Sequence, residues 1–170
     1  RDAVCGRFAV RVVEAATCQR DGWHDGHDQA RQLPEVEEAE LTLCVGQELR
    51  APLEAALGAQ IPDNAYFIGD FRDGAVVSVA GFANWYGHDV EVFLASSGTL
   101  SRGFLRRAAR YAFSELGCIR MTCRVAAGSE WVSGLERLGF VVEGRMRRAF
   151  DGQTDMLIMG CMRDDWKYGQ

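Results

Sequence analysis

Three short stretches near the middle of the chain combine hydrophobic, β-branched and aromatic residues at 65–69, 75–82 and 88–95. Such stretches, bounded by turn residues, are typical of strands. Arg72-Asp73-Gly74 and Tyr86-Gly87 lie between them and are turn signals. We therefore expect three consecutive strands joined by tight turns, which would form an antiparallel meander.

A helical pattern follows the third stretch. Ser101 is a good N-cap residue, and Gly117 is a residue that commonly ends a helix. Between them a single apolar stripe is formed by Phe104, Leu105, Ala108, Ala112 and Leu116. The spacing predicts one helix from Ser101 to Gly117.

The pattern beyond Gly117 predicts strand, helix and two more strands. Residues 119–125 alternate as a strand, and residues 129–138 read as a short helix that Gly139 ends. Residues 140–143 and 156–162 are the last strands, connected through Asp151-Gly152. The order is a meander followed by one β-α-β crossover, which places a mixed sheet between helices.

The N-terminal quarter is harder to interpret. Residues 41–45 alternate in a β-like way, and residues 47–57 have helical spacing with Pro52 near the start. Residues 8–16 fit a helix or a strand equally well, residues 21–28 resemble a loop, and residues 35–40 are acidic and expected to be exposed. Residues 1–40 therefore carry no firm structural prediction.

Composition sets the class of the protein. The chain of 170 residues suffices for one domain and is short for two. Hydrophobic content of 48% and charged content of 25% are globular values. No apolar run approaches the roughly 18 residues of a membrane span, and residues 1–16 lack the apolar core of a signal peptide. The sequence predicts a single α+β domain over residues 1–170 without a membrane partner.

Cysteine usage points to a reduced, cytoplasmic protein. None of the six cysteines forms a C-x-x-C pair, and the four from Cys44 onward sit in apolar surroundings, which predicts buried thiols. His24-Asp25-Gly26-His27-Asp28 holds four ligand-type side chains but has no evident distant partners. We expect a solvated loop there and no metal site.

Charge is unevenly distributed along the chain, whose formal net charge is −5. Residues 1–65 hold 6 arginines against 12 acidic residues, whereas residues 66–170 hold 13 basic against 12 acidic residues. The basic character includes four arginines in the helix from 101 to 117. Overall acidity disfavours a nucleic-acid partner, because binding to the phosphate backbone is largely electrostatic.

The segment from residue 90 to residue 107 has the features of a phosphate-binding site. A helix N-terminus presents unpaired N–H groups and a partial positive charge. The amides expected to face a phosphate belong to Leu100, Ser101, Arg102, Gly103 and Phe104. Arg102, Arg106 and Arg107 are candidates for pairing with phosphate oxygens. Leu94 and Ala95 would offer strand-edge groups to an extended, amide-bearing arm.

Four motifs in sequence order resemble the GNAT superfamily of acyl-CoA-dependent N-acyltransferases, in particular ribosomal-protein N-acetyltransferases and phage-encoded GNAT-like proteins. They lie at residues 110–120, 135–140, 143–147 and 162–166. The resemblance implies a cofactor-binding core over residues 65–166 and a sheet that splays after the fourth strand. It further implies that acetyl-CoA, or a related acyl-CoA, enters the splay, with its pyrophosphate at the helix start and its pantetheine arm along the strand edge.

The chain departs from this family pattern at several positions. Two positions that are usually glycine in the pyrophosphate loop are Thr99 and Ser101. The common Asn and Ser positions at the next helix are Gly128 and Trp131, and a Tyr that often protonates the leaving thiolate is replaced by Leu135. These departures put the activity in question more than the fold.

Acyl transfer to an amine needs a base for the amine proton, and two candidates stand out. Glu91 lies on the strand before the loop, near a position where the family often has a carboxylate, but an exposed strand residue is the simpler interpretation. His88 has an unperturbed pKa near 6.5, which suits proton transfer. Tyr86 and Tyr111 are candidate acids, although Tyr111 is expected to pack beside the apolar stripe. Trp85, Tyr86 and Trp131 would line an acceptor groove or lie in the core.

Three functions remain open from the sequence. The first is an acyl-CoA-dependent N-acyltransferase that acts on an amine of a protein or small molecule, with a homodimer as a candidate assembly. The second is a catalytically inactive GNAT-like binding or assembly protein, suggested by Gly128, Trp131 and Leu135. The third is an acyltransferase for a modified nucleobase or an aminoacylated nucleic acid, suggested only by the arginines.

Overall fold

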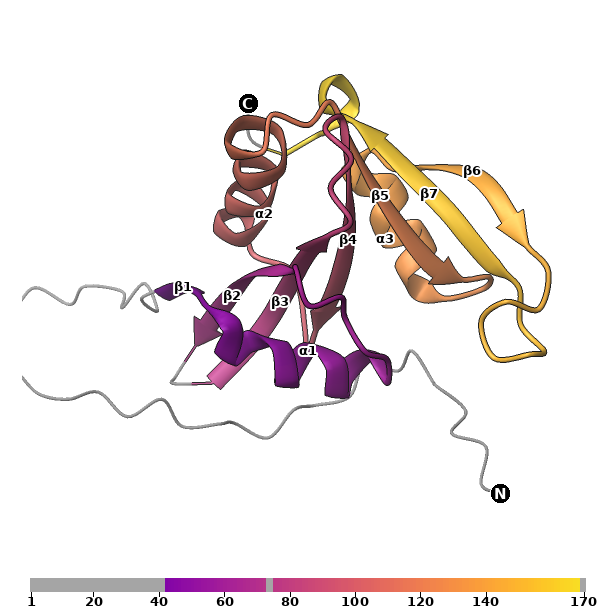
Figure 1. Cartoon of the computed structure of the whole chain (residues 1–170), viewed down its shortest axis with the longest axis horizontal. Helices are drawn as coiled ribbons and strands as arrows, with labels where there is room; N and C mark the ends of the chain where they lie inside the picture. Colours follow the sequence, from indigo (N-terminus) through magenta and orange to yellow (C-terminus); the bar gives the residue numbers. More distant parts are fainter. Residues whose placement is uncertain (1–41, 73–74, 169–170) are drawn as a thin grey trace, which may run out of the picture.

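The computed structural model describes residues 42–72 and 75–168 (Figure 1). The expectations for residues 8–16, 21–28 and 35–40 lie outside that part of the chain, and so does the turn at Asp73-Gly74. The same holds for Cys5, Cys18 and the side chain of Cys44.

Seven strands of the described chain form one mixed sheet in the order β1-β2-β3-β4-β5-β7-β6. Every neighbouring pair is antiparallel except β4 and β5, which run parallel. The predicted meander is β2, β3 and β4, and α2 makes the predicted crossover from β4 to β5; both are confirmed. The strands are β1 Thr42–Val45, β2 Tyr66–Arg72, β3 Ala75–Ala83, β4 Asp89–Ser96, β5 Arg120–Ala126, β6 Val141–Met146 and β7 Met156–Met162.

Helices cover both faces of the sheet (Figure 1). Strand alternation decides which side chains each helix meets, because neighbouring strand residues point to opposite faces. Phe67 and Val79 pack against α1, whereas the adjacent Ile68 and Ala80 belong to the larger cluster with α2 and α3. The helices are α1 Arg50–Leu57, preceded by a 3-10 turn Gln47–Leu49, then α2 Arg102–Ala109 and α3 Glu130–Leu138, with a last 3-10 turn Arg163–Asp165.

The predicted helix ends are confirmed at three positions. The Ser101 hydroxyl accepts the amide hydrogen of Phe104 at 3.1 Å and caps α2. The Ser129 hydroxyl accepts the amide hydrogen of Trp131 at 3.2 Å and caps α3. Gly139 ends α3 in the left-handed region, with φ of 111°.

The helix predicted from Ser101 to Gly117 changes type along its length. The α-helix ends at Ala109, and a π-helical segment, Arg110–Glu115, follows it. Its hydrogen bonds span five residues, as in the bond from the Leu116 amide to the Tyr111 carbonyl. A stripe with 3.6-residue periodicity does not reveal this local widening.

Three cysteines of the described chain, Cys118, Cys123 and Cys161, are buried free thiols, as predicted. Burial raises the pKa of the Cys123 and Cys161 thiols to about 12, because the thiolate would lose its hydration. Among the described helices, none has the length and apolar character needed to cross a membrane.

Gly139 gives a stability test of the packing between α3 and the C-terminal turn. An added Cβ would lie 2.1 Å from the Asp165 carbonyl oxygen, and the residue is in a conformation that disfavours side chains. We expect Gly139→Ala to lower the free energy of unfolding by about 3 kcal/mol, from overpacking and backbone strain together. Urea denaturation measures this change. Gly152→Ala is the matched control, because φ is 83° there but the space is open, and its cost should be only about 1 kcal/mol. Equal losses would contradict the account.

Candidate functional site

The sheet splits between β4 and β5. The two strands pair at only three positions, Asp89 with Arg120, Val90 with Met121 and Glu91 with Thr122. Beyond Glu91, β4 has no partner on this side within the described chain, whereas β5 stays paired with β7 to Ala126. Figure 1 shows the β1–β4 half of the sheet and the β5–β7–β6 half opening away from each other. The predicted splay after the fourth strand is confirmed.

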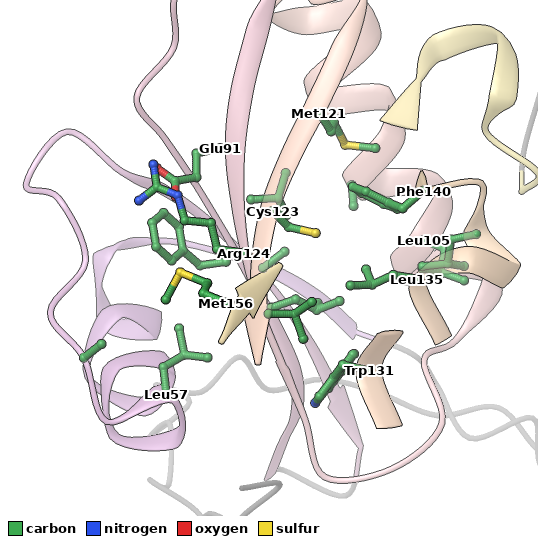
Figure 2. A pocket seen from close by; sticks show the side chains of 18 of the residues that line it. Leu57, Glu91, Leu105, Met121, Cys123, Arg124, Trp131, Leu135, Phe140 and Met156 are labelled. Atoms are coloured by element: carbon green, nitrogen blue, oxygen red, sulfur yellow. The ribbon is translucent and has the colours of Figure 1, made fainter. Parts of the chain in front are cut away.

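A cavity of about 400 Å³ occupies this split and reaches both faces of the sheet (Figure 2). The side toward α2 and α3 is apolar, with linings that include Leu105, Met121, Cys123, Leu135 and Phe140. The side toward α1 is lined by Leu57, Gly58, Ala59, Glu91, Phe93, Arg124, Phe150 and Met156. The split therefore provides a passage through the sheet whose two ends differ in polarity.

A wider groove continues from the α2 and α3 side of the passage. It lies between the loop before α2 and the start of α3, and Leu105, Trp131, Leu135 and Leu138 line both spaces. Its rim includes Gly98, Thr99, Leu100, Arg102, Gly128 and Ser129. A long ligand can thus extend from the start of α2 into the split.

The start of α2 offers fewer free amides than the sequence suggested. The Phe104 amide donates to the Ser101 hydroxyl, so the helix cap already satisfies it. The Arg102 and Gly103 amides have no acceptor among the described residues, as expected for the first turn of a helix. A Cβ on Gly103 would meet nothing closer than 4.0 Å, so the backbone there is open to a ligand.

The three candidate phosphate-binding arginines lie in different surroundings. Arg102 is exposed and lines the groove. Arg106 is exposed but lines neither the groove nor the passage. Arg107 forms an ion pair with Glu115, at the opposite end of the helix from the free amides. Of the three, Arg102 is the one next to the groove.

The candidate strand-edge residues Leu94 and Ala95 both lie in the part of β4 that has no β5 partner. The Leu94 side chain lines the passage. Ala95 points to the other face and packs against the cluster under α1. The backbone of Ala95 pairs with Val79 on β3, so Leu94 is the one of the two whose backbone faces the split.

Glu91 lies at the branch point of the split and is buried, contrary to the simpler interpretation of an exposed strand residue. The Asn84 side chain donates a hydrogen bond of 2.7 Å to Glu91 Oε2. The Arg124 Nε atom lies 3.4 Å from Glu91 Oε1. Asn84, just after β3, and Arg124 on β5 therefore hold this carboxylate at the α1 end of the passage. Figure 2 shows Glu91 beside Arg124.

Sequence reasoning missed both partners of Glu91. Arg124 had a usable signal, since residues 120, 122 and 124 alternate with apolar positions in a predicted strand and so share one face. Asn84 had none, because its contact depends on a left-handed backbone with φ of 50° just after β3. Asparagine tolerates that conformation better than most residues.

The other acid and base candidates lie away from the passage. His88 is exposed in the turn before β4, and its carbonyl accepts the amides of Ile119 and Arg120. Trp85 and Tyr86 are 55% and 78% exposed, so a place in the core is wrong for both. Tyr111 packs on Tyr66 with ring centroids 4.0 Å apart, as expected, and burial raises its pKa to about 12.

Four of the five positions that depart from the family pattern line the passage or the groove, namely Thr99, Gly128, Trp131 and Leu135. Leu135 is buried and lines both spaces, and Trp131 lines both as well. Gly128 forms a left-handed turn with φ of 83° before α3. The residues that line the passage include no tyrosine, serine, threonine or histidine. No cluster of metal-ligating residues occurs in residues 42–72 and 75–168.

Several solved acetyltransferases are similar in structure to this chain. The dodecameric spermidine N-acetyltransferase from Vibrio cholerae is similar with a TM-score of 0.60 and 17% identity, over 75% of this chain and 96% of that one. A chimera of Vibrio cholerae SpeG and hSSAT is similar with a TM-score of 0.59 and 18% identity, over 74% of this chain and 97% of that one. The ribosomal-protein-S5-alanine acetyltransferase from Vibrio fischeri is similar with a TM-score of 0.50 and 17% identity, over 61% of this chain and 64% of that one. No family profile and no curated protein matches the sequence.

These likenesses establish the fold. The chain is an α+β protein with the GNAT acyltransferase fold, a mixed sheet flanked by helices. At identities of 17–18% they carry no information about the substrate of this chain.

The Ser101 cap provides a test of the groove's local structure. We expect Ser101→Ala to lower the free energy of unfolding by about 1 kcal/mol, because the Phe104 amide loses its acceptor. Ser101→Gly should cost only a few tenths of a kcal/mol, since glycine is tolerated at this position. Urea denaturation of the two variants measures the difference. A Ser101→Ala variant as stable as the parent protein would show that the cap contributes nothing.

Proposed function

We propose that this protein transfers an acyl group from an acyl-CoA, with acetyl-CoA as the first choice, to an amine. The observation that carries the proposal is the passage between β4 and β5. It joins a groove with free helix-start amides on one face of the sheet to a buried carboxylate on the other. The fold that this chain shares with solved acetyltransferases supports the proposal.

The residues of the groove fit the parts of coenzyme A. The free amides of Arg102 and Gly103, at the positive end of α2, suit a pyrophosphate. Arg102 adds a guanidinium at the same rim. The backbone groups of Val92 and Leu94, which face the split and have no β5 partner, offer hydrogen bonds to the amides of a pantetheine arm. The thioester end would then lie in the apolar passage near Glu91.

Bound acyl-CoA supplies the activated thioester carbonyl. Glu91 accepts the proton that the amine must lose, directly or through a water, so that the nitrogen lone pair can form the new C–N bond. Asn84 and Arg124 hold the carboxylate in place. The apolar lining, including Met121, Leu135 and Phe140, excludes bulk water from the thioester. The thiolate leaves as the C–S bond breaks, and no hydroxyl side chain among the lining residues is placed to protonate it.

An inactive binding or assembly protein, phage-encoded or not, is the second candidate. The observation in its favour is the hydroxyl-free lining around Leu135, where the family often has a tyrosine. Acetyl-CoA binding without acyl transfer to any amine would favour it. We propose cytoplasmic residence and a homodimer for either function. An acceptor on a nucleic acid is the third candidate, and the exposed Arg102 and Arg106 are its only support.

Cofactor placement predicts an effect of charge at Gly103. We expect Gly103→Asp to weaken acetyl-CoA binding by roughly tenfold or more, because it sets a carboxylate beside the pyrophosphate. Gly103→Asn is the matched neutral control with nearly the same shape, and the site has room for either side chain. Titration calorimetry at low salt measures both. Leu100→Pro should abolish binding by changing the backbone of the loop. Equal affinity in the Asp and Asn variants would move the pyrophosphate elsewhere.

The role of Glu91 predicts a separation of rate from affinity. We expect Glu91→Gln to lower the acyl-transfer rate by about 100-fold, because the amide cannot take the proton. The dissociation constant for acetyl-CoA should stay the same, since Glu91 lies at the opposite end of the passage from the groove. Release of the CoA thiol reports the rate. Glu143→Gln is the control, a carboxylate that pairs with Arg120 and does not line the passage. An unchanged rate in Glu91→Gln would remove Glu91 from the mechanism.

A further inference from the structure

We propose that the acceptor is a small amine that also carries an anionic group, a carboxylate or a phosphate, and that Arg124 binds this anion. The inference rests on the proposed function and identifies the substrate class for the same site. It comes from the charges at the α1 end of the passage, where an acceptor must enter if acyl-CoA fills the other end.

The α1 end of the passage contains one acid and one base. Eight residues line it, and Glu91 and Arg124 are the charged ones among them. The others are glycine or apolar residues from the end of α1 and the loop after it, from β4, from the connection between β6 and β7, and from the start of β7. Figure 2 shows the side chains of Glu91 and Arg124 next to each other, with Met156 and Leu57 nearby. A polar acceptor therefore meets this pair and little else that is charged.

Arg124 has binding capacity left after its contact with Glu91. Its side chain is 53% exposed, against 10% for Glu91, and its Nε lies 3.4 Å from Glu91 Oε1. No side chain or carbonyl in the described chain accepts a hydrogen bond from its two terminal nitrogens. A guanidinium has five N–H donors and suits two-point binding of a carboxylate or phosphate.

Arg120, four residues earlier on the same face of β5, shows the contrast. Its nitrogens donate to both Glu143 oxygens and to the Thr122 hydroxyl, and it also pairs with Asp89. Gly160 leaves the space through which the Glu143 side chain reaches it, since a Cβ there would lie 2.5 Å from Glu143 Oε1. Arg120 is therefore saturated by partners on three strands, whereas Arg124 is open toward the passage.

The pair favours a zwitterion over a simple cation. Glu91 already has a positive partner, so a purely cationic amine would bring a second positive charge beside Arg124. A diamine would find no further carboxylate among the lining residues. An acceptor with both charges can place its anion on Arg124 and its ammonium on Glu91, so that opposite charges alternate. Its anion also displaces Glu91 from Arg124, which frees the carboxylate to accept the proton.

The connection between β6 and β7, next to the α1 end of the passage, also carries exposed positive charge. The connection between β6 and β7 brings Phe150 to the passage and carries Arg147 and Arg148, both exposed. Neither forms a salt bridge within the described chain, whereas Asp155 is held by Arg145 and the Arg148 amide. Asp151 is bonded to Gln153 and Thr154. Because Gln153 and Thr154 do not neutralise Asp151, the charges on this turn without a salt bridge to a described residue are two positive and one negative, and this positive excess suits an anionic acceptor.

Three-carbon amines matched in size test the proposal: 3-aminopropanoate, propylamine and 1,3-diaminopropane carry a negative, a neutral and a positive group beside the amine. A second arm compares 2-aminoethyl phosphate with ethanolamine and separates phosphate from carboxylate recognition. Release of the CoA thiol from acetyl-CoA gives kcat/KM for each. We expect an anionic acceptor to exceed its neutral partner by roughly tenfold or more, with the diamine slowest.

Variants of Arg124 complete the test. Arg124→Gln should remove the preference for the anionic amine, and Arg124→Glu should turn it toward 1,3-diaminopropane. Arg110→Gln is the control, an exposed arginine that lines neither the passage nor the groove. Calorimetry of each amine with the CoA-saturated protein gives an additional readout that does not require turnover, and the same order of affinities is expected.

Two results would overturn the proposal while leaving acyl transfer in place. One is a wild-type preference for propylamine or the diamine, and the other is an anion preference that Arg124→Gln retains. Failure to bind acetyl-CoA at all would overturn the proposed function, and the inference about the acceptor with it. The two failures are thus distinguished by the cofactor titration alone.

Discussion

The loss of pairing between β4 and β5 after Glu91 is the constraint on which the site depends. A continuous sheet would satisfy its backbone groups strand to strand and leave no space between them. Here β5 stays paired with β7 while β4 diverges with β3. The divergence leaves a passage through the sheet and unpaired backbone on one wall, and the crossover through α2 brings free amides to one of its ends.

The same divergence explains why a carboxylate is buried where the strands separate. Glu91 is the last β4 residue with a β5 partner, so its side chain lies next to the first residues that no longer pair. Asn84 from the end of β3 and Arg124 from β5 reach it because β4 lies between those strands. Position in the sheet, more than the identity of the residue, makes Glu91 the candidate base and Arg124 the candidate acceptor-binding residue.

Local features were predictable from the sequence, and contacts between distant segments were not. The strands, the caps at Ser101 and Ser129 and the left-handed end at Gly139 follow from residues within a few positions of each other. The splay came from the family resemblance. The burial of Glu91 and its bond to Asn84 depend on how distant elements pack. The ion pair of Arg107 with Glu115 depends on where the helix widens into a π-helical segment. A pattern of hydrophobic and polar positions carries no record of those partners.

Hydrogen exchange of the backbone amides, with and without acetyl-CoA, tests the central claim that the cofactor occupies the split. We predict slower exchange at Val92 and Leu94, whose amides face the split, and at Arg102 and Gly103, because these unpaired amides would gain acceptors and lose water. The outer strand β6, which is far from the groove in the sheet order, should not change. Protection elsewhere, with residues 92–103 unaffected by saturating acetyl-CoA, would contradict the account.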